Sequence, residues 1–95
     1  MSTEILEKPK TGGQRKHAPN YKVLLHNDDH NTMEYVVESL MKTVPSLSWT
    51  DAVAVMLEAH HTGVGLVIVC PQEPAEFYCE GLQRRGLTST IEPEC

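Results

Sequence analysis

A run of polar side chains between two apolar segments constrains the fold most strongly. Residues 27–31 include two asparagines and two aspartates, and a helical pattern begins two positions later at Met33. Asparagine and aspartate favour strand ends and helix starts, because their short side chains bond backbone N–H groups that lack other partners. Asn31 and Glu34 have the spacing of a capping box. We therefore predict a helix with its N-cap at Asn31, preceded by a loop suited to function.

The apolar residues on the two sides of this loop follow different periods. Residues 21–26 alternate, which places Tyr21, Val23 and Leu25 on one side of a strand. After the loop the apolar spacing is that of one helix face, and Pro45 ends the pattern. The residues on this face are Met33, Val36, Val37, Leu40, Met41 and Val44.

The remainder of the chain predicts two more helices and two more strands. Ser48 and Asp51 have capping-box spacing, and Gly63 is placed to cap the end of the helix that they open. Its expected apolar stripe is Trp49, Ala52, Val53, Met56, Leu57 and His60. The β-branched run 66–70 indicates a central buried strand. Pro74 fits the first turn of a third helix. The expected stripe of that helix is Ala75, Tyr78, Cys79 and Leu82, and a last strand follows at 87–92.

This order, β-α-α-β-α-β, predicts an α+β fold. Few strands with separate helices favour a small, mostly antiparallel three-stranded sheet that helices cover on one face. The distribution of charged residues indicates a boundary between an N-terminal arm and a domain. Residues 1–19 carry four basic and two acidic side chains, whereas residues 20–95 carry four basic and eleven acidic ones. We expect a flexible arm at 1–19 and one domain at 20–95.

Composition excludes several classes of function. The acidic domain argues against nucleic-acid binding, which needs Lys and Arg to displace counterions. The sequence contains no run of eighteen apolar residues, so we expect no membrane span, and we also expect no secretory leader. Three cysteines without a Cys-x-x-Cys motif fit reduced thiols. We expect a cytoplasmic monomer that uses no cofactor.

Several polar residues are candidates for binding or chemistry. His60 fits either a buried core position or the rim of a site near the polar loop. Asp28, Asp29 and His60 could ligate a metal, although the spacing matches no established pattern. Motifs for a nucleophile or a phosphate loop are absent from the sequence. Asn27, Asp28 and His60 could instead bond an ammonium group.

An apolar pocket could adjoin that ammonium site. Met33, Val36 and Met56 come from the stripes of two consecutive helices and could line it. The pattern fits three ordinary core residues equally well.

Three segments together resemble the ClpS family of adaptor proteins. They are the Asn-Asp-Asp loop at 27–29 behind its strand, the Met-Glu-Tyr-Val-Val helix start at 33–37, and Met-Leu-Glu-Ala-His at 56–60 followed by Gly63. The likeness extends from about residue 21 to residue 92. It implies an adaptor without catalytic activity that binds an N-degron, a protein whose first residue is large and hydrophobic. Such adaptors deliver the substrate to a Clp/Hsp100 AAA+ unfoldase, ClpA or ClpC, for degradation by the ClpP protease.

The resemblance also implies roles for individual residues. The substrate's α-amino group would be bound by Asn27, Asp28 and His60. The side-chain pocket would consist of Met33 as gatekeeper, Val36, Met56, Ala59 and Leu87. The loop and helix cap would comprise Asp29, Asn31 and Thr32. Glu73 and Tyr78 would lie on the face that docks the N-terminal domain of the unfoldase, and the arm would engage the unfoldase during delivery.

Two departures from the family pattern bear on specificity. Asn31-Thr32 stands where the family usually has Thr-Pro, and Ala59 where Val is common. We expect Phe, Tyr and Leu as first residues, with Trp as a further candidate, and poor binding of β-branched Ile and Val. Two alternatives remain: a ClpS-fold modulator of the unfoldase that has lost N-degron binding, and a small metal-dependent enzyme.

Overall fold

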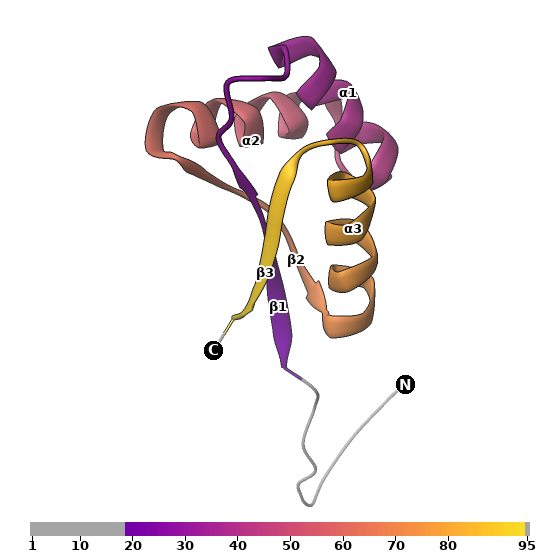
Figure 1. The fold of residues 1–95 in the computed structure, drawn as a ribbon. Helices are drawn as coiled ribbons and strands as arrows, with labels where there is room; N and C mark the ends of the chain where they lie inside the picture. Colours follow the sequence, from indigo (N-terminus) through magenta and orange to yellow (C-terminus); the bar gives the residue numbers. More distant parts are fainter. Residues whose placement is uncertain (1–18, 95) are drawn as a thin grey trace, which may run out of the picture.

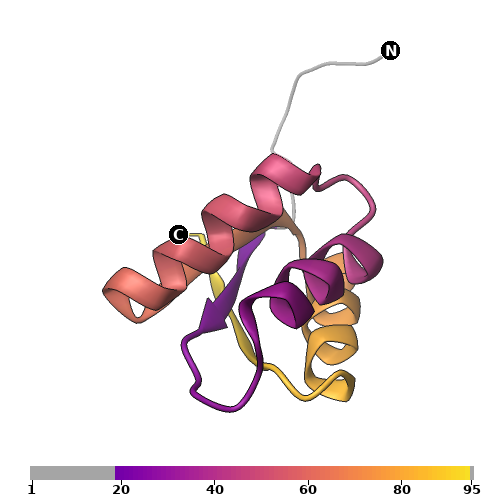
Figure 2. The same ribbon diagram turned by 90° about the horizontal axis from the view of Figure 1, so that it is seen from above.

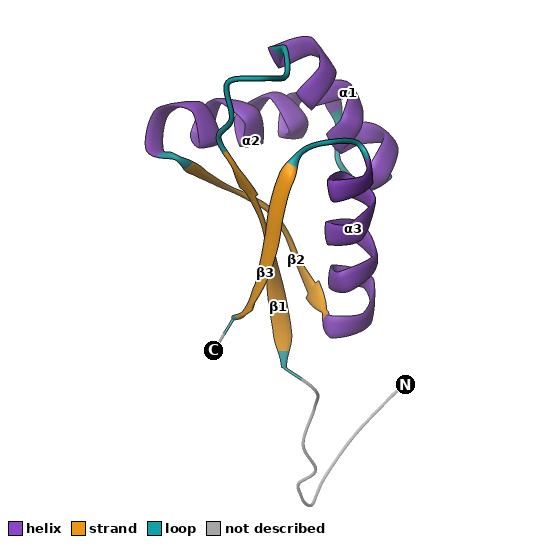
Figure 3. Cartoon of the chain, in the orientation of Figure 1, coloured by secondary structure: helices purple, strands orange, loops and turns teal. Residues whose placement is uncertain are grey.

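The computed structural model describes residues 19–94, so the predicted arm lies outside the described residues apart from Pro19. The element order is β-α-α-β-α-β, as predicted. The elements are β1 (Asn20–His26), α1 (Met33–Thr43), α2 (Trp49–Thr62), β2 (Val64–Pro71), α3 (Gln72–Arg84) and β3 (Thr88–Pro93) (Figures 1 and 3).

The three strands form one antiparallel sheet in the order β2-β1-β3. The predicted fold class is confirmed, but β2 is an edge strand, so the prediction that residues 66–70 form the central strand was wrong. A continuous apolar run does not distinguish an edge strand from a central one. Leu66, on the outer face of β2, is 41% exposed. The pairing of β1 with β2 also shifts register between Val23 and Leu24.

One face of the sheet carries the core. Val23 and Leu25 on β1 are buried, whereas Lys22, Leu24 and His26 on the opposite face are half-buried. This is the alternation predicted from the sequence. All three helices pack against the sheet or against each other, and Figure 2 shows them grouped around the inner face of the strands. Their fully buried side chains include Leu40, Ala52, Ala75 and Leu82, and Val44 directly after α1 is buried as well.

Helix α1 begins one residue later than predicted. Its N-cap is Thr32, whose Oγ1 accepts a hydrogen bond from the backbone N–H of Tyr35 at 3.1 Å. The prediction of Asn31 as the cap was therefore wrong. The hydroxyl of Thr32 meets the first free N–H groups of the helix, while the side chain of Asn31 is bonded elsewhere.

Helix α2 has the predicted ends but a different buried face. Ser48 and Asp51 form a capping box, and Gly63 closes the helix with φ 95°. The buried residues are Ala52, Val55, Met56 and Ala59. Trp49, Leu57 and His60 are exposed, so these three predictions of a buried stripe were wrong.

Contact with β2 explains which face of α2 is buried. A Cβ atom on Gly65 of β2 would lie 2.5 Å from the backbone oxygen of Val55. The glycine therefore lets the helix lie directly on the strand. Since α2 is apolar on several sides, this contact and not the sequence period decides the orientation.

Helix α3 begins at Gln72, so Pro74 lies in its first turn as predicted. Ala75, Cys79 and Leu82 are buried and Tyr78 is half-buried, which confirms the predicted stripe. Gly86 follows the helix with φ 87°.

Candidate functional site

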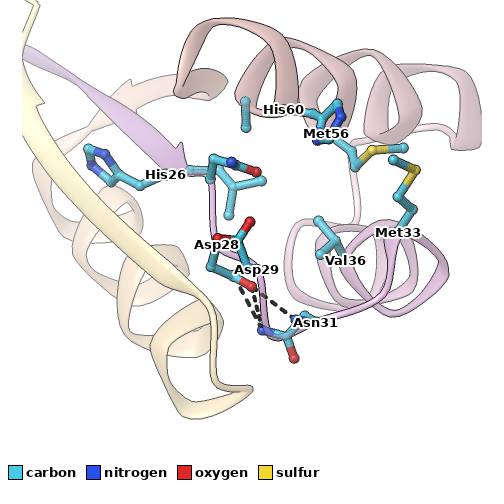
Figure 4. A pocket seen from close by; sticks show the side chains of 11 residues that line it. His26, Asp28, Asp29, Asn31, Met33, Val36, Met56 and His60 are labelled. Carbon is cyan, nitrogen blue, oxygen red and sulfur yellow. Dashed lines mark hydrogen bonds between the residues drawn. The ribbon is translucent and has the colours of Figure 1, made fainter.

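A cavity of about 140 Å³ lies where the end of β1, the loop 27–32, the start of α1 and the end of α2 meet. Figure 4 shows the side chains that surround it. The lining residues are Leu25, His26, Asn27, Asp28, Asp29, Asn31, Met33, Val36, Met56, Ala59 and His60. The structure thus brings together every residue predicted for the amine site and all of those predicted for the apolar pocket except Leu87.

The loop is folded around the carboxylate of Asp28. Its Oδ1 accepts hydrogen bonds from the backbone N–H groups of His30 at 2.9 Å and Asn31 at 3.0 Å. Partial burial alone would raise the pKa of Asp28. The bonds from the backbone of Asn31 and His30 outweigh this effect, so the pKa lies below its usual value. Asp28 is therefore a carboxylate at neutral pH.

Asn31 joins the loop to the turn between α3 and β3. Its Nδ2 donates to the backbone oxygen of Gly86 at 3.1 Å and also lies 3.3 Å from Oδ2 of Asp28. The hydroxyl of Tyr35 donates to the backbone oxygen of Arg85 at 2.7 Å. The turn after α3 is thus bonded to the loop and to α1. The first residue of the loop is fixed separately, because Asn27 N donates to the oxygen of Gly63 at 3.0 Å.

The inner wall of the cavity is apolar. Val36, Met56 and Ala59 are buried, whereas Met33 is 47% exposed and stands at the mouth. Met33 comes from α1 and Met56 from α2, and their side chains project toward one another between the two helices (Figure 4). The exposed Met33 can cover or open the pocket by changing rotamer, since methionine is unbranched and has several rotatable bonds.

The outer rim is polar. Asn27 and His60 are exposed and Asp28 is half-buried. His60 therefore occupies the rim and not the core. The ring of His61 lies 5.3 Å away at an angle of 72°, and His61 does not line the cavity. A carboxylate, an amide oxygen and an imidazole nitrogen can all accept hydrogen bonds from an ammonium group.

His26 is a lining residue that the sequence did not single out as part of a site. It is the last residue of β1, directly before Asn27, and this adjacency to the loop is the signal in the sequence that could have found it. Its Nε2 lies 2.7 Å from Oγ1 of Thr90 on β3, so its ring is held toward the sheet.

The other predicted residues lie away from this cavity. Leu87 is buried in the core. Glu73 and Tyr78 on α3 line a separate, shallower cavity of about 530 Å³. Its remaining residues are Lys42, Thr43, Pro45, Pro74 and Phe77. Within residues 19–94, no group of three or more His, Cys, Asp or Glu side chains is arranged to hold a metal ion. In the same range no helix has the length and apolarity needed to cross a membrane.

Comparison with known proteins identifies the family. The family model described as ATP-dependent Clp protease adaptor protein ClpS matches residues 16–90. The chain belongs to the ClpS family. This family membership makes it a non-catalytic adaptor of the Clp protease, as the sequence resemblance implied.

Relatives match along the whole chain. The ClpS protein of Synechococcus elongatus is 61% identical over 94 residues, which cover 99% of each chain. ClpS of Gloeobacter violaceus is 59% identical over 95 residues and covers all of both chains. The chloroplastic CLPS1 of Chlamydomonas reinhardtii is 57% identical over 89 residues, or 92% of this chain and 55% of the relative. These relatives come from cyanobacteria and a chloroplast.

A solved structure shares the fold. Agrobacterium tumefaciens ClpS2 bound to L-phenylalaninamide superposes with a TM-score of 0.77 at 32% identity. The match covers 82% of this chain and all of that one.

Proposed function

We propose that this ClpS protein binds polypeptides with a free α-amino group on a large hydrophobic first residue, and delivers them to a ClpC- or ClpA-type unfoldase for degradation by ClpP. The observation that carries the proposal is one cavity with a polar rim beside an apolar wall. The ligand of Agrobacterium ClpS2 supports it, because phenylalaninamide joins a free amine to an aromatic side chain.

The rim supplies the partners for the amine. Asp28 contributes a negative charge and Asn27 an amide oxygen. His60 contributes a ring nitrogen, which accepts a hydrogen bond only when the imidazole is neutral. Hydrogen bonds to an ammonium group are charge-assisted and about twice as strong as neutral ones. Internal hydrophobic residues lack this group, so the rim would select chain termini.

The apolar wall would select the side chain. An apolar cavity of about 150 Å³ holds a benzene ring, so about 140 Å³ suits Leu, Phe or Tyr. Trp requires the pocket to widen, for which Ala59 leaves more room than Val would. Burying a Leu-sized side chain contributes about 1.5–3 kcal/mol, or roughly 10- to 150-fold in affinity. Branching at Cβ brings Ile and Val against the mouth at Met33.

Delivery would use other parts of the chain. Glu73 and Tyr78 line a cavity at the C-terminal end of α1 and the start of α3, and this cavity shares no residue with the amine site. We assign this face to docking on the N-terminal domain of the unfoldase, and the arm 1–19 to contact with the unfoldase during transfer. The adaptor would act as a monomer in the cytoplasm.

Peptide affinities test the proposal. Fluorescence anisotropy would be measured for peptides that begin with Leu, Phe, Tyr, Trp, Ile, Val or Ala, on the parent protein and on Met33→Ala. The parent should bind Leu and the aromatics at least tenfold more tightly than Ile, Val or Ala. Met33→Ala should narrow the gap to Ile and Val, because a smaller side chain leaves space for the Cβ branch.

Two results would count against this assignment. Unaltered discrimination in Met33→Ala would remove Met33 from the gatekeeper role. Absence of binding to every peptide would favour the alternative of a modulator that docks the unfoldase without taking N-degrons.

A further inference from the structure

A larger groove adjoins the cavity described above, which is called the N-terminal pocket because it would hold the first residue of the substrate. It has a volume of about 580 Å³ and lies between α1 and α2. Its lining residues are Met33, Glu34, Val37, Glu38, Met41, Lys42, Trp49, Val53 and Met56. Met33 and Met56 line both spaces, so the groove begins at the mouth of the pocket.

The surface of this groove is apolar and exposed. Trp49 is 63% exposed and Met41 is 36% exposed, although both are large hydrophobic residues. Glu38 and Lys42 on the rim form an ion pair at 2.9 Å, which offsets their charges. Contiguous exposed apolar surface on a small protein marks an interaction site, and here apolar contact would dominate recognition.

The geometry of α1 gives the length of the groove. Met33 and Met41 are eight residues apart, which corresponds to about 12 Å along a helix. An extended peptide advances about 3.3 Å per residue. A chain whose first residue fills the pocket would therefore place residues two to five beside α1, with the fourth or fifth near Met41. Trp49 and Met41 both lie toward the α1–α2 connection, at the end of the groove away from the pocket.

We propose that this groove binds the substrate segment that follows the substrate's first residue and selects an apolar side chain at the substrate's fifth position. The inference rests on the proposed function, because the peptide is placed by its first residue. Continuity with the pocket favours the substrate as occupant. A second copy or another partner seated on the groove would cover Met33 and close the mouth.

Trp49 is the only tryptophan of the chain and therefore reports on the groove directly. Tryptophan-free five-residue peptides with a Leu first residue would carry either Leu or Ser at position five. Leucinamide, which fills the pocket alone, is the short probe. The peptide with Leu at position five should shift the Trp49 emission to the blue and bind about 3- to 10-fold more tightly than its Ser counterpart, as expected for partial burial of one Leu. Leucinamide should bind without this shift.

Two variants locate the effect. Trp49→Ala should lose the preference for Leu over Ser at position five while it keeps its affinity for leucinamide. Phe77→Ala is the matched control, since Phe77 is 64% exposed on α3 and does not line the groove. It should keep the preference.

The outcomes separate the two proposals. If leucinamide binds but the Leu and Ser peptides bind with equal affinity, or if the peptide with Leu at position five leaves the Trp49 spectrum unchanged, the groove proposal is wrong and the proposed function is unaffected. Absence of binding by leucinamide and by both peptides would overturn the proposed function and the groove with it. If Trp49 in the free protein already emits like a buried indole, another part of the chain covers the groove and the groove proposal is wrong.

Discussion

Asp28 has two sets of partners, and its two carboxylate oxygens divide between them. Oδ1 accepts two backbone bonds from the loop, whereas Oδ2 lies near only the amide of Asn31, at 3.3 Å, among the described residues. Oδ2 is therefore the oxygen that can turn to an incoming ammonium group. The Asp28 side chain both holds the loop together and supplies the negative charge. Substitutions at this position must therefore distinguish the loss of the loop bonds from the loss of the charge.

Asp28→Asn and Asp28→Ala make that separation. Asparagine keeps an acceptor for the loop but loses the charge, so peptide affinity should fall about 10- to 150-fold, the equivalent of a charged hydrogen bond of roughly 1.5–3 kcal/mol. Alanine also removes the loop bonds, which should lower the free energy of unfolding by about 1 kcal/mol for each bond. Anisotropy and urea unfolding measure the two effects. Equal peptide affinity in the parent and Asp28→Asn would remove Asp28 from the amine site.

The lowered pKa of Asp28 fixes the direction of its pH dependence. A carboxyl whose folded pKa is depressed stabilises the fold above its unfolded pKa, near 3.8. That contribution is lost as pH falls through the lower folded pKa. Asp28 should therefore stay charged throughout the neutral range. In the parent protein its contributions to peptide binding and to stability should fade only at pH below about 4.

The contacts of Asn31 show which features of single residues could not be predicted from the sequence. The polar loop, its position before a helix and the grouping of Asn27, Asp28 and His60 were open to prediction from residue type and family pattern. The bond from Asn31 to the oxygen of Gly86 was not, because it joins residues 55 positions apart. The sequence predicted Asn31 as the cap, whereas in the structure Thr32 is the cap and the side chain of Asn31 bonds to Asp28 and Gly86.

Helix α2 illustrates the same limit for a whole element. Its ends follow from local chemistry at Ser48, Asp51 and Gly63, and these predictions are confirmed. Its buried face does not follow from local chemistry, because the close approach of Gly65 to Val55 is a tertiary contact. Orientation of α2 matters for function, since Met56, Ala59 and His60 reach the cavity only from this face.

Gly65→Ala tests the role of this contact. A Cβ would lie 2.5 Å from the backbone oxygen of Val55 and 3.2 Å from the nitrogen of Ala59, so α2 has to move. We expect a loss of about 1–3 kcal/mol in the free energy of unfolding and weaker peptide binding, measured by urea denaturation and anisotropy.

Gly81→Ala is the matched control. Its Cβ would meet only the side-chain methyl of Thr43, at 2.8 Å, and alanine favours a helix interior by roughly 0.5–1 kcal/mol. Peptide binding by Gly81→Ala should be unchanged. Parent-like stability and binding in Gly65→Ala would show that the position of α2 does not depend on this glycine.

For the whole molecule, the proposal separates substrate binding from docking. The N-terminal pocket lies between the end of β1, the start of α1 and the end of α2, whereas Glu73 and Tyr78 line a cavity at the start of α3. The element order and the α+β class were predictable, because capping signals and apolar periods are local. Strand order was not, since β1 and β3 pair across more than sixty residues.

Reversal of one exposed charge tests this separation. Glu73→Arg should weaken binding to the N-terminal domain of a ClpC- or ClpA-type unfoldase at least tenfold, and leave peptide affinity unchanged. Glu76→Arg is the control on the same helix, because Glu76 is exposed and does not line the docking cavity. Pull-down with the purified domain and anisotropy give the two readouts. Equal unfoldase binding by both variants and the parent would place the docking face elsewhere.

The central claim is that this protein recognises a free amine together with a large side chain. The most direct measurement is fluorescence anisotropy with two peptides that start with Leu and differ only in acetylation of the first residue. Acetylation removes the positive charge and leaves the partners at Asn27, Asp28 and His60 unpaired, at a cost of about 1–3 kcal/mol for each lost bond. Binding of the free peptide should be tight and that of the acetylated peptide undetectable. Equal binding of both peptides would contradict the claim and make the cavity a general hydrophobic site.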